Sequence, residues 1–261
     1  MLKHLFFSTT LAFIIVSCAV SPLGRSQFMF MPSNEIDTMG TEAFENLKKE
    51  TPVERNRNLN NYVSCISNAI IQVSQSDIPQ WEVVVFQDDS ANAFALPGGK
   101  IGVHTGLLTV ADNANRLATV IGHEVAHVLS QHGNERVSQE FAVQQSLALI
   151  QALANVQTET GQMLMGLLGV GAQFGVILPF SRIHESEADM LGLQLMAKAG
   201  FDPRESVSLW QNMERAGGDQ TPEFLSTHPS HETRIADLNK AMASAMQTAT
   251  QAAGNRPNCR L

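Results

Sequence analysis

The segment His123-Glu124-Val125-Ala126-His127 constrains this chain more than any other, because it sets two histidines and a glutamate in an otherwise apolar run of helical periodicity. Positions four apart lie about 40° apart around a helix, so both imidazoles point the same way and can bind one zinc ion. Glu124 lies about 100° from the first histidine, within reach of a water on the metal without being a ligand. The alternative is a helix that holds two histidines by chance, but burying them unpaired would be costly. The motif therefore predicts a metal site on this helix.

A catalytic zinc also needs a third protein ligand and an open position for water. His132 follows the motif by five residues and would lie about 140° round a continuous helix, off the metal face. In the segment Ser181–Asp189, Glu185 and Asp189 are four apart and share a helix face, whereas Glu187 lies about 200° away from Glu185. If Glu185 binds the metal, Asp189 can accept a hydrogen bond from a ligand imidazole. The alternative is a solvated acidic helix start.

The order of predicted elements favours an α+β fold, because strands come first and helices follow. Residues 81–86 read as a strand, and 92–96 and 100–104 flank Pro97-Gly98-Gly99, a hairpin signal, which predicts a small antiparallel sheet. Apolar residues fall at helical spacing from 36 to about 74. Further helices are expected at 105–111, 113–132, 135–159, 162–178, 184–199, 203–216 and 230–250.

Composition limits the possible partners. The chain has 261 residues with 44% apolar content, enough for one sizeable core, and 25 acidic against 17 basic residues give a net charge of -8. Such a chain has no electrostatic footprint for a phosphate backbone, which argues against nucleic acid as a partner. Residues 163–180 are strongly apolar, but Gln173 and four glycines favour a helix that is buried or covers a cleft over a membrane span.

The first residues form a targeting segment, with an apolar run from Leu5 to Val16. The four residues 15–18, IVSC, resemble a bacterial lipobox, which would make residues 1–17 a signal peptide and Cys18 the lipid-modified N-terminus. The alternative is an ordinary signal peptide cleaved after Ala19 or nearby. By resemblance to sorted lipoproteins, Ala19 favours the outer membrane.

The remaining organisation follows from composition and cysteine placement. Residues 18–35 are predicted to be a tether, 36–250 the globular domain and 251–261 a tail. In an oxidising compartment, Cys65 and Cys259 are expected to form a disulfide that ties the tail to an N-terminal helix. Two unpaired thiols are the alternative.

Four ordered motifs between Trp81 and Ala236 carry a family resemblance: HEVAH, SRIHESEAD, FDPRE and STHPSHETR. Together they resemble the gluzincin-type zinc metallopeptidases of the HtpX, BepA and Oma type, with the BepA-like or Oma-like lipoprotein branch, without tetratricopeptide repeats, fitting best. The resemblance implies a mostly helical zincin-type domain, with Glu185 as third ligand and Asp189 behind it. It also implies that His228 can approach the zinc and occupy the water position as a gate, and that Arg234 contacts substrate or the developing oxyanion. The alternative for His228 is a loop histidine that caps the next helix.

The same resemblance makes Asn92, Ala93 and Phe94 part of a strand whose exposed edge lies along the cleft, where a peptide can add as an extra strand. The sequence therefore predicts a peptidase with one zinc per chain. It is expected to act at the periplasmic face of the bacterial outer membrane, bound there through the N-terminal lipid, and to cleave misfolded or unassembled envelope proteins. A chaperone or outer-membrane assembly factor on the same fold is the main alternative, and a purely structural zinc is a third.

Overall fold

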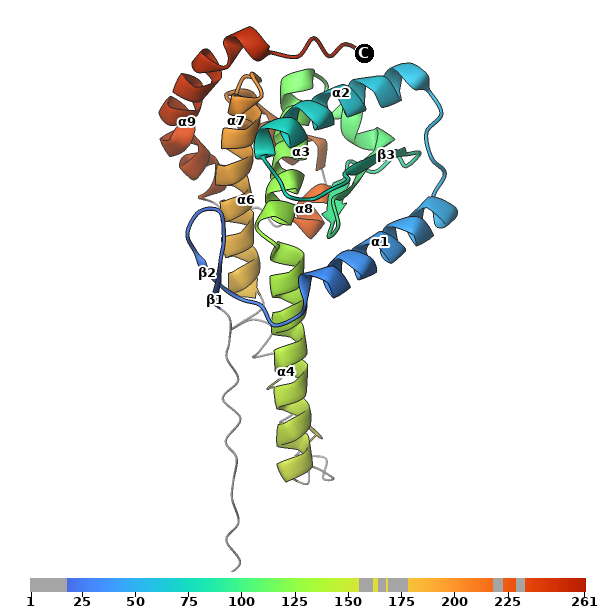
Figure 1. Cartoon of the computed structure of the whole chain (residues 1–261), viewed down its shortest axis with the longest axis vertical. Helices are drawn as coiled ribbons and strands as arrows, with labels where there is room; N and C mark the ends of the chain where they lie inside the picture. The colour runs from blue at the N-terminus through green and yellow to red at the C-terminus, as the bar shows by residue number, and fades with distance from the viewer. Residues whose placement is uncertain (1–17, 155–161, 164–167, 169–177, 218–222, 229–232) are drawn as a thin grey trace, which may run out of the picture.

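In the computed structural model, which describes residues 18–154, 162–163, 168, 178–217, 223–228 and 233–261, long helices pack against a small sheet that lies at one side of the molecule (Figure 1). The strands are β1 (Cys18–Val20), β2 (Ser26–Phe28), β3 (Glu82–Phe86), β4 (Ala93–Leu96) and β5 (Lys100–His104). The helices are α1 (Ser33–Glu50), α2 (Arg57–Ser74), α3 (Ala114–Leu129), α4 (His132–Ala154), α6 (Leu178–Lys198), α7 (Glu205–Gly217), α8 (Glu223–Thr227) and α9 (Arg234–Gln251), with 3-10 turns η1 (Thr105–Thr109) and η3 (Ala253–Asn255). The α+β class predicted from the sequence is confirmed.

The three-stranded sheet has the order β3-β5-β4, so β4 lies at its edge. The predicted hairpin forms, and β5 pairs antiparallel with β4 but parallel with β3. The sheet is therefore mixed, where the sequence predicted an antiparallel one. Residues 87–92 lead from β3 to β4, which is not the neighbour of β3. The hairpin then places β5 between these two strands, antiparallel to β4 and so parallel to β3. Gly102 is required in β5, because an added Cβ would lie 2.2 Å from the ring of Phe94.

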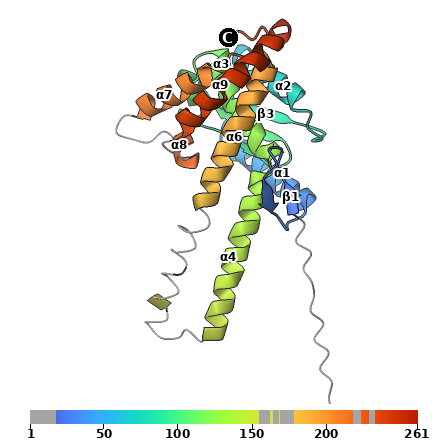
Figure 2. The same ribbon diagram turned by 90° about the vertical axis from the view of Figure 1, so that its left-hand side faces the viewer.

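Helices α3 and α6 form the centre of the molecule and lie side by side in both views (Figures 1 and 2). Their backbones approach closely at Gly122 and Gly192, where a Cβ on Gly192 would lie 2.8 Å from the backbone nitrogen of His123. Helix α3 is capped at its N-terminus by Asn113, whose side chain accepts hydrogen bonds from the backbone N–H groups of Asn115 and Arg116. The middle of α3 is buried among the core residues. The close crossing brings the motif helix directly against the helix that carries Glu185.

Several helix boundaries differ from those expected. The segment 36–74 forms two helices, because residues 51–56, which include Pro52, separate α1 from α2. Helix α3 ends at Leu129, and a turn at Ser130 and Gln131, where Gln131 has a φ of 49°, precedes α4. Helix α6 already begins at Leu178, with Pro179 in its first turn, a position that proline tolerates.

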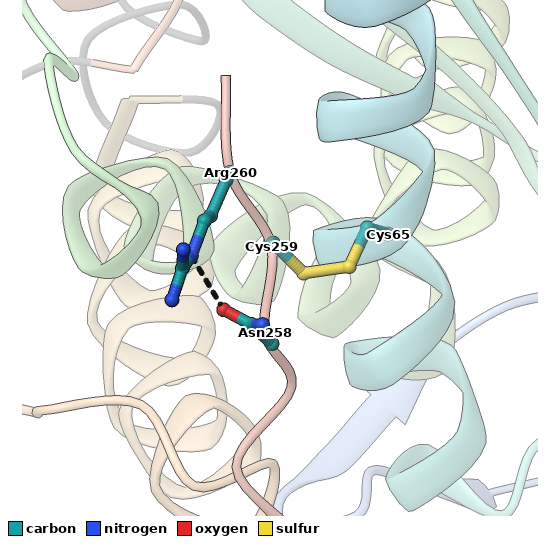
Figure 3. The surroundings of a disulfide bond; sticks show 4 residues. All are labelled: Cys65, Asn258, Cys259 and Arg260. Carbon is teal, nitrogen blue, oxygen red and sulfur yellow. Dashed lines mark hydrogen bonds between the residues drawn. A yellow bond between two sulfur atoms is a disulfide. The ribbon is translucent and has the colours of Figure 1, made fainter.

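Both ends of the described chain are attached to this body. Within residues 18–35, where the sequence predicts a tether, β1 and β2 pair as an antiparallel hairpin. At the other end, a disulfide joins Cys65 of α2 to Cys259, with Cα atoms 5.7 Å apart (Figure 3). Beside it, the Arg260 guanidinium donates a hydrogen bond to the side-chain oxygen of Asn258. Residues 1–17 and most of 163–180 lie outside the described residues. Within the described part, no helix has the length and apolar character needed to cross a membrane.

Candidate metal centre

Helix α3 presents both motif histidines on one face, as the spacing predicts. Their Nε2 atoms lie 3.0 Å apart, and the two rings are nearly perpendicular, at 72°. His123 is buried, and the side chain of His127 is 15% exposed, on the side of the cleft. The two nitrogens therefore face a common point that a small ligand can reach.

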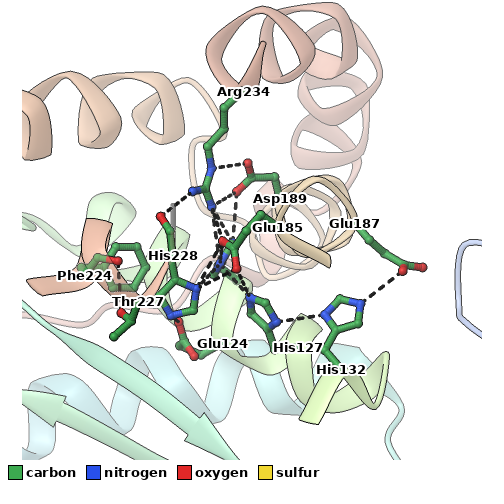
Figure 4. Close-up of polar contacts among 11 residues, drawn as sticks. Glu124, His127, His132, Glu185, Glu187, Asp189, Phe224, Thr227, His228 and Arg234 are labelled. Carbon is green, nitrogen blue, oxygen red and sulfur yellow. Dashed lines mark hydrogen bonds and ion pairs between the residues drawn. The ribbon is translucent and has the colours of Figure 1, made fainter. Parts of the chain in front are cut away.

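Glu185 approaches the same point from α6, and His228 approaches it from the end of α8 (Figure 4). Glu185 Oε2 lies 3.2 Å from His123 Nε2, and Glu185 Oε1 lies 3.4 Å from His127 Nε2. His228 Nδ1 lies 3.1 Å from Glu185 Oε1. One ligand atom from each of these four residues, hereafter the metal-ligand cluster, lies within 4.8 Å of all the others.

The chemistry of the cluster fits zinc. Three imidazole nitrogens and one carboxylate oxygen are ligand types that zinc prefers, and four is its usual coordination number. Two neutral imidazole nitrogens that face each other at 3.0 Å compete for one proton, whereas a cation between them would use both lone pairs. A catalytic zinc has three protein ligands and one position open to water, whereas four permanent protein ligands make a structural site.

Asp189 and Arg234 hold the cluster from behind. Asp189 Oδ1 lies 3.0 Å from His123 Nδ1 and accepts from Arg234 Nη2 at 2.8 Å. Arg234 also donates to Glu185 Oε2 at 3.2 Å, and its guanidinium lies 3.6 Å from the ring centre of Trp210. The guanidinium is buried and committed to these contacts. Its geometry favours orientation of Glu185 and Asp189 over the contact with substrate that the resemblance implies.

Burial and these partners shift the pKa values of the metal-free site. Burial acts to lower the pKa of His123, but the hydrogen bonds with Asp189 and Glu185 outweigh it and raise the pKa to about 9. For Asp189, burial acts to raise the pKa, while the charge of Arg234 and the hydrogen bond with His123 lower it overall. Burial lowers the pKa of His127 well below its usual range. A protonated His123 must lose a proton when a metal binds. Metal affinity should therefore increase as the pH rises towards the pKa of His123.

Glu124 lies beside the cluster without belonging to it. Its side chain is 2% exposed, its Oε1 atom has no hydrogen-bond partner among the described residues, and His228 Nε2 lies 3.4 Å from that atom. Burial raises the pKa of this carboxyl. An unpaired buried carboxylate oxygen is costly unless a ligand or water uses it. The position suits a base that takes a proton from a group at the cluster.

His132 and Glu187 have roles that sequence reasoning missed. Because α3 ends at Leu129, His132 does not continue its helix, and its Nδ1 lies 2.9 Å from His127 Nδ1. Its Nε2 lies 3.2 Å from Glu187 Oε2, and burial lowers the pKa of His132 to about 4. Hydrogen bonds with His132 and Ser21 outweigh the burial of Glu187 and lower its pKa to about 2. The sequence offered no local signal for this pairing, because His132 and Glu187 lie 55 residues apart in the chain.

A cleft of about 1080 Å³ opens on the cluster. Its lining includes Glu124, His127 and His228 together with Asn92 and Phe94 of the β4 region. The β4 region therefore borders the same cleft as the cluster. The ring of Phe94 packs against Phe44 and Phe86, and Ala93 is fully buried, so the strand offers its backbone more than its side chains.

The sequence matches the profile of Peptidase family M48 over residues 57–242. The mitochondrial metalloendopeptidase OMA1 of Schizosaccharomyces pombe is 39% identical over 186 residues, which cover 70% of this chain and 53% of that protein. The mitochondrial metalloendopeptidase OMA1 of Bos taurus is 33% identical over 256 residues, covering 90% of this chain and 48% of that protein. The beta-barrel assembly-enhancing protease of Escherichia coli K12 is 27% identical over 206 residues, which cover 76% of this chain and 42% of that protein. The chain thus spans about half the length, or less, of these relatives.

Proposed function

Because the chain belongs to peptidase family M48, we propose that it is a zinc-dependent endopeptidase in which Glu124 is the general base. The single observation that carries this proposal is the convergence of the metal-ligand cluster beside an unpaired, buried glutamate oxygen. The names of its relatives, metalloendopeptidase and protease, support the same activity.

The residues divide the chemistry between them. His123, His127 and Glu185 hold the zinc, which when bound supplies a Lewis acid that lowers the pKa of water and polarises a peptide carbonyl. Glu124 takes the proton from the attacking water and delivers it to the amine nitrogen of the leaving group. Burial raises its pKa, which favours the step in which Glu124 holds the proton before delivering it. Asp189 fixes the ring of His123 by accepting its Nδ1–H.

His228 is proposed to gate the site. Its ring lies between Glu185 and Glu124, with Nδ1 towards the first and Nε2 towards the second. A water must stand in this region to be reached by Glu124. In the described arrangement the enzyme is therefore proposed to be latent, and opening requires the ring of His228 to move. The helix expected at 162–178 as a cover for the cleft lies mostly outside the described residues.

Extended polypeptide is the proposed substrate class. Strand β4 is an edge strand of the three-stranded sheet, with no further strand paired to its outer side in the part of the chain that the structure describes, and it contributes to the lining of the cleft. A peptide that pairs with this edge is bound largely through its backbone, which requires an unfolded segment and little sequence preference. Misfolded or unassembled proteins expose such segments.

The proposed location is the periplasmic face of a bacterial outer membrane, with attachment through a lipid on Cys18. The lipobox-like residues 15–18 and the cysteine pair that forms the Cys65–Cys259 disulfide support a compartment of this kind. One relative is a beta-barrel assembly-enhancing protease of Escherichia coli, and others are mitochondrial. Metabolic labelling with a palmitate analogue, compared between the parent and Cys18→Ser, tests the lipid; equal labelling of both would contradict it.

Glu124→Gln tests the activity. The substitution keeps the shape of the side chain but removes the base, so the zinc content should stay the same while cleavage of unfolded casein falls by about 10²-fold or more. Chelator treatment should abolish parent activity, and added zinc should restore it. Casein cleavage by a zinc-loaded Glu124→Gln protein at the parent rate would contradict the proposal. A chaperone role would instead show as unchanged suppression of substrate aggregation in this variant.

A further inference from the structure

A chain of polar contacts runs away from His127 on the side opposite the metal-ligand cluster (Figure 4). The Nε2 atom of His127 faces the cluster, and its Nδ1 atom lies 2.9 Å from His132 Nδ1. At the other nitrogen of the His132 ring, Nε2 lies 3.2 Å from Glu187 Oε2. Arg25 of the N-terminal hairpin then donates from Nε to the same carboxylate oxygen at 2.8 Å. Arg25, Glu187 and His132 are hereafter called the relay.

The contacts at Glu187 determine which nitrogen of His132 carries a proton. An ionised carboxylate only accepts hydrogen bonds. Glu187 is the acceptor for Arg25 Nε and for the hydroxyl of Ser21, so the remaining partner, His132 Nε2, must also donate. A neutral His132 with hydrogen on Nε2 has its lone pair on Nδ1.

The lone pair on His132 Nδ1 in turn determines the state of His127. It can only accept, so His127 must donate from Nδ1 across the 2.9 Å contact. The lone pair of His127 is then on Nε2, the atom that faces His123 and Glu185. The opposite arrangement would put hydrogen on His127 Nε2 and would prevent it from binding a metal.

We propose that His132 is a positioning residue that presents the Nε2 lone pair of His127 to zinc, and that Glu187 and Arg25 hold it in that state. The inference rests on the metal site of the proposed function. Asp189 bonds directly to the ligand His123, whereas the carboxylate of Glu187 acts on the ligand His127 through the imidazole of His132.

The surroundings of His132 hold its ring in one orientation. The ring stacks on His184, with centres 4.3 Å apart and planes at 17°. His184 Nε2 lies 3.0 Å from Glu135 Oε2, and Arg25 donates to both oxygens of Glu135 at 2.7 and 2.8 Å. The side chains of His132 and Glu187 are 4% and 5% exposed, so water competes little for these contacts. The N-terminal hairpin thereby takes part in the support of a metal ligand.

Zinc affinity of the full chain, measured by competition with a chromophoric chelator, tests the proposal. His132→Ala should weaken zinc binding about 10- to 100-fold, the usual effect of losing a partner of a ligand histidine. His132→Asn should restore most of the affinity, because its Oδ1 occupies the position of Nδ1 and can accept from His127. His104→Ala, which removes a buried histidine of β5, is the matched control and should leave the affinity unchanged. A folded His132→Ala protein with parent affinity would overturn the relay.

The protonation pattern of the metal-free parent gives a second readout that needs no variant. Nitrogen-15 histidine spectra should show His127 with hydrogen on Nδ1 and His132 with hydrogen on Nε2, and Glu187→Gln should make the His132 signals heterogeneous. A parent with hydrogen on His127 Nε2 would overturn the relay. The metal site itself is tested separately, since a parent that binds no zinc would contradict the proposed function and the relay together, whereas normal zinc binding with an unaffected His132→Ala contradicts the relay alone.

Discussion

At the scale of single residues, the site buries charged side chains, and most of them have a hydrogen-bonding partner of opposite charge that offsets the cost of burial. Glu185 and Asp189 are buried carboxylates whose pKa values are lowered, because histidine and arginine partners outweigh the effect of burial. Glu124 is the exception, since its Oε1 atom has no hydrogen-bond partner among the described residues and its pKa is raised. The carboxyl oxygen left without a hydrogen bond therefore belongs to the residue to which the proposed mechanism assigns proton transfer.

Loss of the Asp189 side chain should weaken the metal site without direct removal of a ligand. Asp189→Ala leaves His123 Nδ1 without its carboxylate partner and leaves Arg234 with the carboxylate of Glu185 alone, so zinc affinity should fall about 10- to 100-fold. Asp202→Ala is the matched control, because Asp202 pairs with Arg204 at the surface. Chelator competition measures both, and equal zinc affinities for the two variants would argue against this role for Asp189.

His228→Ala should increase activity if the ring blocks the site at rest. The substitution removes the group between Glu185 and Glu124 and leaves the three proposed permanent ligands. Zinc content should therefore be retained, while the initial rate of casein cleavage rises severalfold. A variant that keeps zinc but is slower than the parent would show that His228 assists the reaction rather than blocking it.

At the scale of elements, periodicity predicts what lies within one helix, but not what a break between helices does. The common face of His123 and His127 follows from their spacing of four, and the hairpin follows from Pro97-Gly98-Gly99. The position of His132 does not follow from its spacing, because the angle of about 140° assumes a continuous helix and α3 ends at Leu129.

Long-range pairing is the other part that local patterns do not contain. Glu187 was placed away from the metal face of its helix, and it does point away from Glu185. The hairpin of β1 and β2 covers that face, however, and supplies Arg25 as a partner. The parallel pairing of β3 with β5 likewise depends on the path of residues 87–92 rather than on strand composition.

The crossing of α3 and α6 provides a prediction for this pair of elements. Gly192→Val adds atoms where even a Cβ would lie 2.8 Å from the backbone of His123, so the helices must separate. The free energy of unfolding should fall by about 1–3 kcal/mol, measured by urea denaturation, and zinc affinity should fall as Glu185 moves away. Gly254→Val is the matched control, because within the described residues no heavy atom beyond its own chain neighbours lies within 4 Å of its added Cβ. Equal stability of the two variants would contradict close packing at the crossing.

At the scale of the whole molecule, the disulfide connects the tail to the α2 layer. Cys65 and Cys259 are 194 residues apart in sequence, so the bond closes nearly the whole domain. The double variant Cys65→Ala/Cys259→Ala should lower the free energy of unfolding by about 2–5 kcal/mol, because the unfolded chain gains freedom. The parent in reductant should match this variant in urea denaturation. Unchanged stability of both would show that the tail is held without the bond.

The proposed activity requires one zinc ion bound beside Glu124. The most direct test is a zinc titration of metal-free His228→Ala protein, with casein cleavage measured at each ratio of zinc to chain. The same titration is repeated with the double variant that also carries Glu124→Gln. We expect cleavage to rise linearly and to stop at one zinc per chain, and the variant with Glu124→Gln to bind the same zinc without cleavage. Cleavage that is independent of zinc, or that survives Glu124→Gln at full zinc occupancy, would contradict the account.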